Sequence, residues 1–328
     1  MSLSFSDHFS PGEVGFPISI SRLIEKTLGI MSATFNPYCQ DDESWETYLK
    51  GRPVIPDSFY DLIYDYHTSN GGSFHTVHDA GAGAGVQSEK LSKKFKRVLL
   101  SDPSEENMAV AHRNLANEQF RFQSQSIDMV HCGTMLHWTK VDKALDAVAH
   151  QLKPGGTFAA YTCAVPTMHD PYIDSVWKKI IHRGPADMAR NLPRDSPGWQ
   201  PMLCAGETVG SAYDSVPLPD KYFRPGAQRI RINWPEDWDW HTYMVHEDLR
   251  DEWKYVSAIG ERDLVVGQSR PGWQLKTNLK GLHDSLASMN FDLETPEMRE
   301  LVRELEEAVE DRKVEGVWPV TLLLATRK

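Results

Sequence analysis

The sequence predicts an α/β protein with a doubly wound, mostly parallel sheet and a separate lid insertion. Between Phe74 and Tyr161, short apolar runs alternate with helical patterns, as they do in a parallel sheet whose strands are joined by helices. A glycine-rich loop follows the first of these runs. A region rich in proline and tryptophan then interrupts the alternation, before the chain returns to a helix and a strand near its C-terminus.

Short apolar runs predict the strands at the centre of this sheet. Three of them cover His75–Asp79, Arg97–Ser101 and Ile127–His131, and a helix is expected over Val86–Lys96, between the first two. Thr157–Tyr161 predicts a fourth strand. Each run has the length of an ordinary strand in a globular protein.

Capping signals and periodicity predict the other helices of the core. Ser104 can cap a helix after the second strand, and the acidic residues behind it suit the positive end of a helix dipole. Pro154–Gly156 would stop the helix before the fourth strand. Thr295 and the proline after it would start a C-terminal helix, and a final strand is expected over Val317–Thr326. The apolar faces of these two helices consist of Leu145, Val148, Ala149 and Leu152 in the first, and Met298, Leu301, Val302, Leu305 and Val309 in the second.

The region from Pro166 to Pro235 is interpreted as an insertion with its own packing. It carries ten of the 20 prolines, and seven of the ten tryptophans fall between Trp177 and Trp273. Within it, Arg229–Ile232 alternates polar and apolar residues, which predicts one strand of the main sheet beside the final strand. The tryptophans either fill a small core within the lid or form aromatic walls of a substrate pocket.

Four segments follow from these predictions. Residues 1–44 form an N-terminal extension and residues 45–165 form the central α/β core. Residues 166–290 form the lid, which includes one core strand near 227–234. Residues 291–328 supply the helix and strand that complete the core.

Composition excludes several classes of partner. The 46 acidic and 35 basic residues give a net charge of −11, which disfavours a broad phosphate-binding surface, so nucleic acid is not expected. No apolar run approaches the roughly 20 residues that span a bilayer, and no secretory signal precedes the core, so a cytoplasmic protein without membrane contact is expected.

His241 and His246 lack the spacing of a zinc helix, and no metal site is predicted. The cysteines form no CxxC pair, which suits a reducing compartment. The oligomeric state stays open.

The most informative motif is the stretch from Asp79 to Gly85, Asp-Ala-Gly-Ala-Gly-Ala-Gly, between the first strand and its helix. Alternate glycines permit unusual backbone angles and let a ligand approach the main chain. A dinucleotide fingerprint would place glycine or alanine where Val86 stands. That departure, and the acidic residue before the loop, argue against NAD.

Two carboxylates define the expected ligand more closely. Asp79 suits a ligand with an ammonium group, and Asp102, at the end of the second strand, suits a ribose diol that donates two hydrogen bonds. Together with the glycines, these groups describe a site for S-adenosylmethionine. The alternative is a tight strand-to-helix turn with Asp102 as an ordinary loop residue.

These segments resemble the class I, seven-stranded S-adenosylmethionine-dependent methyltransferases, whose sheet is Rossmann-like. The resemblance extends over the glycine loop, Leu100–Asp102, Ser126–Val130, Met135–Trp138 and Leu152–Gly156. Within the family the sequence looks most like the trans-aconitate methyltransferase-type branch of fungi. That branch begins with a similar pattern, matched here by Tyr48, Arg52-Pro53, Pro56 and Phe59-Tyr60.

The resemblance implies a cofactor-binding set along the first three strands. Gly81, Gly83 and Gly85 would line the methionine part of S-adenosylmethionine, while Asp79 would steer its amino group. Asp102, followed by Pro103, would hold the ribose hydroxyls. Residues 131–134 would form the floor beneath the sulfonium, at the carboxyl end of the central strand. Of these four residues, Cys132 and Gly133 are assigned to cofactor binding.

On the substrate side the resemblance implies His137 and Trp138, with Tyr48 and Arg52 closing over the site from the N-terminal helix. His137, Tyr48 and Arg52 are the candidate catalytic residues. Trp138 and His131 are candidate substrate-binding residues, although a packed strand residue is the favoured interpretation of His131. Cys132 is interpreted as a small apolar filler and not as a nucleophile.

One interval departs from the family pattern. Only nine residues, Glu118–Ser126, separate the second helix from the central strand, so a third strand with its loops hardly fits. The family normally places an adenine-contacting acid there, and none lies between Gln119 and Ile127. We therefore expect a missing or shortened third strand at the sheet edge, where its loss leaves the interior ladder paired.

The predicted function is in-line methyl transfer from S-adenosylmethionine to a small molecule, either a carboxylate or a secondary metabolite. A carboxylate acceptor needs no base, whereas a hydroxyl, amine or thiol is helped by one, for which His137 or His131 is best placed. Two alternatives stay open: a relative that binds or cyclises a ligand without methylating it, and an interaction protein whose cofactor site is vestigial.

Overall fold

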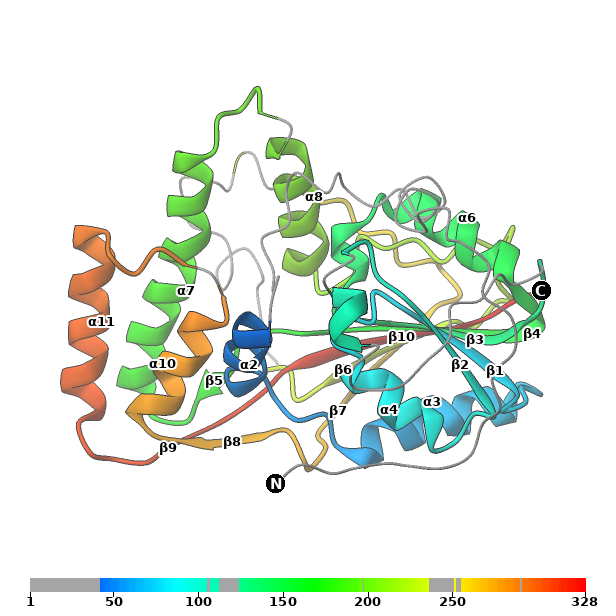
Figure 1. Cartoon of the computed structure of the whole chain (residues 1–328), viewed down its shortest axis with the longest axis horizontal. Helices are drawn as coiled ribbons and strands as arrows, with labels where there is room; N and C mark the ends of the chain where they lie inside the picture. The colour runs from blue at the N-terminus through cyan, green and yellow to red at the C-terminus, as the bar shows by residue number, and fades with distance from the viewer. Residues whose placement is uncertain are drawn as a thin grey trace.

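The computed structural model describes residues 42–104, 107–111, 124–196, 198–235, 251, 255–289 and 291–328. Figure 1 shows a sheet with helices packed on it, beside a second layer made mostly of helices. None of the helices in these ranges is long and apolar enough to cross a membrane.

The main sheet has seven strands in the order β2-β1-β3-β4-β10-β6-β7 within the described residues. Neighbouring strands are parallel except at β10, which runs antiparallel to both β4 and β6. This is the mostly parallel α/β sheet that the sequence predicts. The strands are β1 (Thr76–Ala80), β2 (Arg97–Ser101), β3 (Ile127–Gly133), β4 (Leu152–Cys163), β6 (Gln228–Ile232), β7 (Leu264–Gln268) and β10 (Val320–Thr326).

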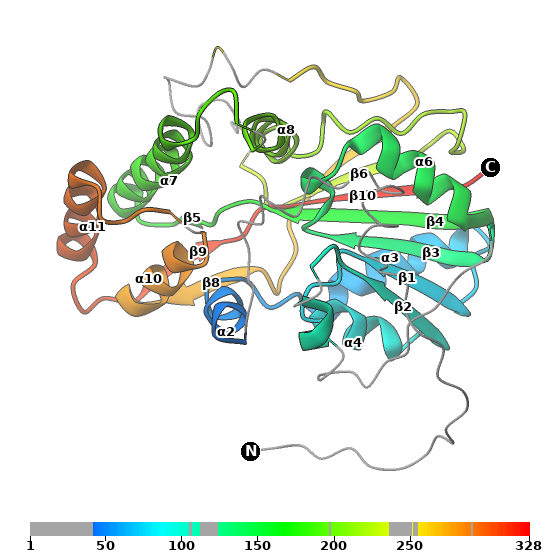
Figure 2. The same ribbon diagram turned by 45° about the horizontal axis from the view of Figure 1, so that its top comes forward.

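Apolar side chains cover both faces of this sheet, which makes it doubly wound. Helices α3 (Asp57–Ser69) and α4 (Val86–Ser92) pack on one face, where Phe59 and Leu91 join a buried cluster. Helix α6 (Val141–Gln151) packs on the other face through Leu145 and Val148. Figure 2 shows α6 on the opposite side of the sheet from α3 and α4.

The second layer has a small sheet and its own core. The sheet has the order β5-β9-β8, formed by Thr167–Met168, Val314–Val317 and Gln274–Thr277. The helices of this layer are α7 (Pro171–Asn191), α8 (Trp199–Gly210), α10 (Leu279–Ala287) and α11 (Pro296–Val309). Helix α2 (Asp42–Lys50) lies between α10 and α4 in both views (Figures 1 and 2).

The predicted strands are confirmed, and Arg97–Ser101 matches β2 residue for residue. The fourth strand is longer than predicted, because α6 ends at Gln151 and β4 already includes Pro154–Gly156, which were expected to stop that helix. The helix expected over Val86–Lys96 ends earlier, at Ser92. Leu152, expected on the helical stripe of α6, instead begins β4. The predicted strand beside the final strand is β6, which pairs with β10.

One prediction about the C-terminal segment is wrong, and the bounds of another need correction, since β10 begins only at Val320. Helix α11 does not complete the main core, because its apolar face packs on α7 and shares a buried cluster with that helix. The final strand is two strands, since Pro319 has no N–H to donate and interrupts the run. Residues before the break pair in the small sheet as β9, and those after it pair in the main sheet as β10.

One edge strand of the seven-stranded sheet comes from a segment that was predicted to belong to the lid. Most of the interval Glu118–Ser126, where a shortened third strand was expected, lies outside the described residues, since 112–123 are not among them. Within the described residues β2 is one edge of the sheet, and the other edge is β7, which the sequence analysis placed in the lid.

The lid tryptophans that the structure describes take both expected roles and a third. Trp177 and Trp199 are buried among side chains of the helical layer, as a lid core requires. Trp234 lines a cavity instead. Trp273 joins the main core and packs edge-on against Phe59, with their ring centroids 5.4 Å apart.

Candidate active site

The glycine loop leaves the carboxyl end of β1 and enters α4 in a shape that glycine alone accepts readily. Gly81, Gly83 and Gly85 have φ angles of +70°, +55° and +82°. These lie in the left-handed region that side chains with a Cβ rarely adopt. The amides of Gly81 and Ala82 both donate to the carbonyl of Ser101, at 2.7 and 3.0 Å, so the loop is joined to the end of β2.

Two side chains from elsewhere in the chain cover this loop. A Cβ on Gly81 would lie 2.6 Å from the Cγ of Met135, and a Cβ on Gly83 would lie 2.4 Å from the Cη2 of Trp45. The loop is therefore a cradle that a side chain would fill. Its glycines suit the close approach of a ligand, but in this structure Trp45 packs directly against Gly83.

Asp102 lies at the carboxyl end of β2, directly beside the loop. Its Oδ2 accepts a hydrogen bond from the Gly83 amide at 3.0 Å. Its Oδ1 accepts from the Ser104 amide at 3.0 Å and from Asn107 Nδ2 at 2.9 Å. Burial raises the pKa of this carboxyl, against the lowering effect of these three donors. The carboxylate is thus held toward the loop, in the place where the resemblance puts a ribose.

Asp79 supports the loop from inside the sheet. Its Oδ1 lies 2.8 Å from His131 Nδ1, and its Oδ2 accepts a bond from the Ser88 hydroxyl at 2.6 Å. The Asp79 side chain is 2% exposed and His131 is fully buried. The structure thus favours the packed-strand interpretation of His131, and the predicted contact of Asp79 with an amino group stays a prediction.

The predicted floor of the site is the carboxyl end of β3. Cys132 is buried, and burial raises the pKa of its thiol, which keeps it protonated and supports its interpretation as an apolar filler. At Gly133 a Cβ would lie 3.1 Å from the Tyr161 hydroxyl. A larger residue here would meet that ring, so the end of β3 stays narrow.

His137 and Trp138 follow this floor in a short 3-10 helix, Leu136–Trp138. His137 is buried, and its Nδ1 lies 3.4 Å from the Tyr213 hydroxyl. Burial, and next the positive charge of Arg52, lower the pKa of His137 to about 3. The imidazole is therefore neutral near pH 7. Trp138 is half-buried with its ring 5.2 Å from that of His137.

Tyr48 and Arg52 reach this region from α2 and the turn after it. The Arg52 guanidinium lies 4.9 Å from the centre of the Tyr48 ring and donates through Nη2 to the carbonyl of Ser288 at 3.0 Å. The positive charge of Arg52 also acts on the pKa of His137. The catalytic roles of Tyr48, Arg52 and His137 stay predictions.

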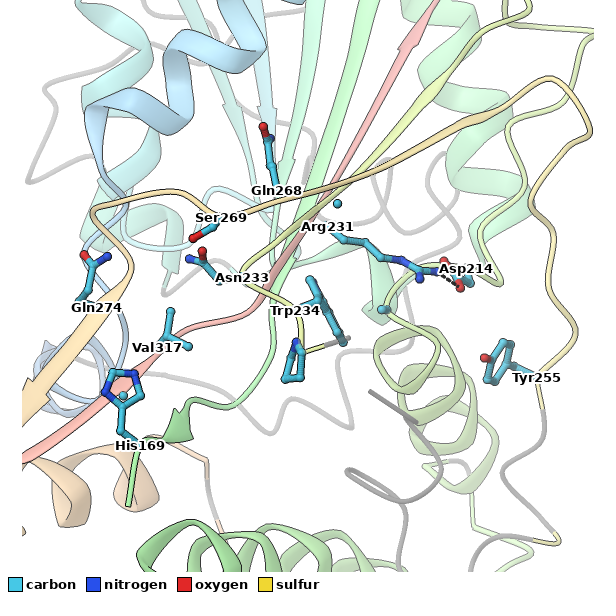
Figure 3. A pocket seen from close by; sticks show the side chains of 14 residues that line it. His169, Asp214, Arg231, Asn233, Trp234, Tyr255, Gln268, Ser269, Gln274 and Val317 are labelled. Atoms are coloured by element: carbon cyan, nitrogen blue, oxygen red, sulfur yellow. Dashed lines mark hydrogen bonds and ion pairs between the residues drawn. The ribbon is translucent and has the colours of Figure 1, made fainter. Parts of the chain in front are cut away.

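An open cavity of about 990 Å³ lies at the carboxyl ends of β6 and β7 (Figure 3). Trp234 and Tyr255 supply aromatic rings, and Arg231 forms an ion pair of 2.6 Å with Asp214. None of the site residues predicted from the sequence lines it. The cavity nevertheless adjoins them, because Ala212 and Asp214 line it while Tyr213 between them reaches His137.

A buried arginine in β6 holds the wall of this cavity in place. The Arg229 guanidinium donates to the carbonyls of Tyr213 and Val216, at 3.0 and 2.8 Å, and pairs with Asp263 at 2.8 Å. Ala212 and Tyr213 have φ angles of +50° and +64°, so the wall turns sharply there. The Arg229 contacts stabilise that turn.

Sequence reasoning missed Trp45, Asn107 and most of the cavity. Trp45 lies three residues before Tyr48, so helical spacing places both on one side of α2, a signal that was available. Asn107 lies five residues after Asp102 and lacks any local signal. The cavity residues come from segments far apart in the sequence, which only the fold brings together.

Comparison with known proteins agrees with this geometry. Residues 78–160 match the family described as a methyltransferase domain. A methyltransferase of Claviceps purpurea is 33% identical over 305 residues, which cover 88% of this chain and 93% of the relative. The methyltransferase AacuQ of Aspergillus aculeatus is 34% identical, over 87% of this chain and 93% of its own length.

A solved structure supports the fold over the same extent. A protein described as a type II methyltransferase from Anaeromyxobacter dehalogenans superposes with a TM-score of 0.52, over 84% of this chain and 97% of that one, at 16% identity. The fold, the matched domain and the fungal relatives agree with one another. The chain is therefore a member of the class I S-adenosylmethionine-dependent methyltransferase family.

Proposed function

We propose that this methyltransferase binds S-adenosylmethionine at the glycine loop and methylates a small molecule, with a carboxylate as the preferred acceptor. The observation that carries the proposal is the loop itself. Its glycines stand at every second position, 81, 83 and 85, and all three have positive φ angles. They lie beside the buried carboxylate of Asp102, at the carboxyl edge of the sheet. Open α/β sheets bind their ligands at this edge.

The residues present suit this cofactor. Gly81, Gly83 and Gly85 provide a main-chain surface without Cβ atoms, and Asp102 offers acceptor oxygens to a ribose diol. When bound, S-adenosylmethionine supplies an electrophilic methyl group on its sulfonium. The protein then has to align the acceptor and exclude water from the site.

The cavity supports a small-molecule acceptor. Its volume of about 990 Å³ falls within the range of ligand pockets, and it combines two aromatic rings with several amide and hydroxyl groups. Tyr213 lies between this space and His137. We propose that the acceptor occupies the cavity and presents its reacting atom toward His137.

The state of His137 favours a carboxylate over a hydroxyl acceptor. With a pKa of about 3, its imidazole is a weak base that removes a proton from a hydroxyl poorly. A carboxylate needs no proton removal, only groups that orient it. Arg52, whose charge acts on His137, and the Tyr48 ring that it stacks on offer a charge and a hydroxyl for that purpose.

Three further parts of the proposal rest on the compared relatives and on the sequence. The fungal origin of the compared relatives supports a secondary metabolite as the acceptor. The sequence pattern around Tyr48 and Arg52 supports kinship with the trans-aconitate-type branch. The scattered cysteines and the negative net charge support a protein of the cytoplasm that acts on no nucleic acid.

The test combines binding with transfer. Calorimetry with S-adenosylmethionine should give a measurable affinity, and the methyl-labelled cofactor should label carboxylic acids in a panel that pairs each acid with its alcohol or phenol counterpart. The rate should show no rise with pH between 5.5 and 7.5, because His137 is already neutral there. Labelling of the hydroxyl counterparts alone, with a rate that rises through this range, would refute the carboxylate assignment. Binding without transfer to any acceptor would favour a non-methylating relative.

A further inference from the structure

The cofactor loop and helix α2 are joined by a closed ring of four residues. The Trp45 ring packs on Gly83, as the 2.4 Å approach to a Cβ position there shows. The Gly83 amide donates to Asp102 Oδ2 at 3.0 Å, and Asp102 Oδ1 accepts from Asn107 Nδ2 at 2.9 Å. Asn107 Oδ1 in turn accepts from Trp45 Nε1 at 3.0 Å, which completes the ring.

Asp102 has too few free acceptor positions for a ribose while this ring is closed. A carboxylate offers about four lone-pair positions, and Gly83, Ser104 and Asn107 already occupy three of them. A ribose diol needs two. The bonds from Gly83 and Ser104 come from the backbone, whereas the bond from Asn107 comes from a side chain that can rotate away.

Among the described residues, α2 is also anchored at its C-terminal end, away from Trp45. A Cβ on Gly51 would lie 2.4 Å from the carbonyl oxygen of Asp284 in α10, and Ser285 donates its hydroxyl to the Gly51 carbonyl at 3.2 Å. Arg52 adds its bond to Ser288. Trp45 lies six residues before Gly51, which corresponds to about 9 Å along the helix axis. The helix can therefore swing about its C-terminal end when the Trp45 contact is released.

We propose that Asn107 is a positioning residue that couples ribose binding to the release of Trp45 from the glycine loop. The ribose replaces the Asn107 amide on Asp102, the amide turns away, and Trp45 loses its hydrogen bond. The ring then leaves Gly83, which opens the loop surface to the methionine part of the cofactor. This inference rests on the proposed function, because it concerns how the same site accepts S-adenosylmethionine.

The coupling predicts that variants that break the ring bind S-adenosylmethionine more tightly than the wild type. Closing the ring stabilises a form of the protein that cannot bind the cofactor fully, and this lowers the apparent affinity in proportion to its population. Removing a partner from the ring should therefore tighten binding. Asn107→Leu and Trp45→Ala should each lower the calorimetric Kd for S-adenosylmethionine by about 2- to 10-fold, the effect of one hydrogen bond.

Further variants separate the ring from general damage to α2. The double variant should gain no more than the better single variant, since both break the same ring. Trp45→Phe, which keeps an aromatic ring but loses the N–H, should gain part of the effect and guards against misfolding of the alanine variant. Glu46→Ala is the matched control, because Glu46 is an exposed neighbour that pairs only with Lys50 in the described residues. Its affinity should stay that of the wild type.

Hydrogen exchange supplies a readout that a merely structural role would not change. In the wild type, S-adenosylmethionine should speed amide exchange in residues 44–50. Asn107→Leu should show the faster exchange without ligand and no further increase with it. Unchanged or weaker affinity in either single variant, or slower exchange of 44–50 on binding in the wild type, overturns the coupling. Absence of binding in the wild type and in every variant overturns the proposed function itself, so the two failures are distinguishable.

Discussion

The glycine loop and the cavity at β6 and β7 lie at the same edge of one sheet, yet they are built differently. At the loop both buried carboxylates already have hydrogen-bond partners in the protein: Asp79 contacts His131 and Ser88, and Asp102 accepts from three groups. In the cavity, among the described residues, the Nε of Arg231 has no partner, and a Cβ on Gly267 would touch nothing. The first region is closely packed and made from adjacent strands, whereas the second is open and made from distant segments.

This difference matches the two ligands that a methyltransferase needs. The cofactor is the same for the whole family, so a short motif beside two neighbouring strands is enough to bind it. The acceptor varies, and an open cavity lined by an insertion can change without disturbing the sheet. Substitutions should therefore act on one ligand at a time.

The largest effect is expected at the glycine loop. Gly83→Arg should abolish S-adenosylmethionine binding, because the side chain would fill the loop surface at a φ of +55° and within reach of Trp45. Calorimetry measures the loss. Gly71→Arg is the matched control, since Gly71 also has a positive φ, +85°, but faces open space. Equal affinity in both variants would count against the site.

A smaller loss is expected when the ribose carboxylate is neutralised. Asp102→Asn should weaken S-adenosylmethionine binding by about 1–3 kcal/mol through lost charge-assisted hydrogen bonds. Asp128→Asn is the control, because Asp128 is also buried and also accepts a backbone amide, that of Thr76 at 2.9 Å, but at the opposite end of the sheet. It should lower the midpoint of urea unfolding and leave the cofactor affinity unchanged. Similar cofactor affinities for both variants would contradict the assignment.

Arg231→Gln should weaken binding of the acceptor in the cavity without changing binding of the cofactor at the glycine loop. It removes the ion pair with Asp214 and the one arginine or lysine side chain among the described residues that line the cavity. The KM for the acceptor found in the panel should rise by about 5-fold, on the order of 1 kcal/mol, while the Kd for S-adenosylmethionine stays constant. A change in the cofactor Kd with an unchanged acceptor KM would reverse the assignment of the two regions.

The smallest effect at neutral pH is expected at His137, and it grows in acid. Its folded-state pKa of about 3 lies below the usual value of 6.5, so the stability it supports is complete above pH 6.5 and is lost as the pH falls toward 3. His137→Gln removes this titration. Urea unfolding at pH 7 and pH 5 should show a smaller loss of stability in the variant. His67 and His78, whose pKa values are also lowered by burial, keep some acid sensitivity in both proteins.

How far the sequence predicts the molecule depends on whether the signal is local. The run Arg97–Ser101 and the cap at Thr295 were predicted correctly because a short apolar run and a capping residue are properties of a few adjacent residues. The glycine loop was predicted for the same reason. The placement of α11 was wrong, because its apolar face fits a helix or a sheet equally well and only the fold selects α7.

The site shows the same limit. His137 and Arg52 were predicted from the family resemblance, but their influence on each other depends on how α2 packs. Asn107 is an ordinary polar residue in the sequence, and its two hydrogen bonds join groups 62 and five positions away. Contacts across such separations carry no periodic signal, so the ring of four residues could not be predicted.

The break at Pro319 has a consequence for how the chain is made. One short segment on either side of it supplies the middle strand of the small sheet, β9, and an interior strand of the large one, β10. Residues 76–163, which contain β1 to β4, therefore leave the ribosome long before β10, the strand between β4 and β6, has been made. Nascent chains should expose the edges of β4 and β6 until β10 has been made and has left the ribosome, so the two layers should gain their final order together, only after that segment is free.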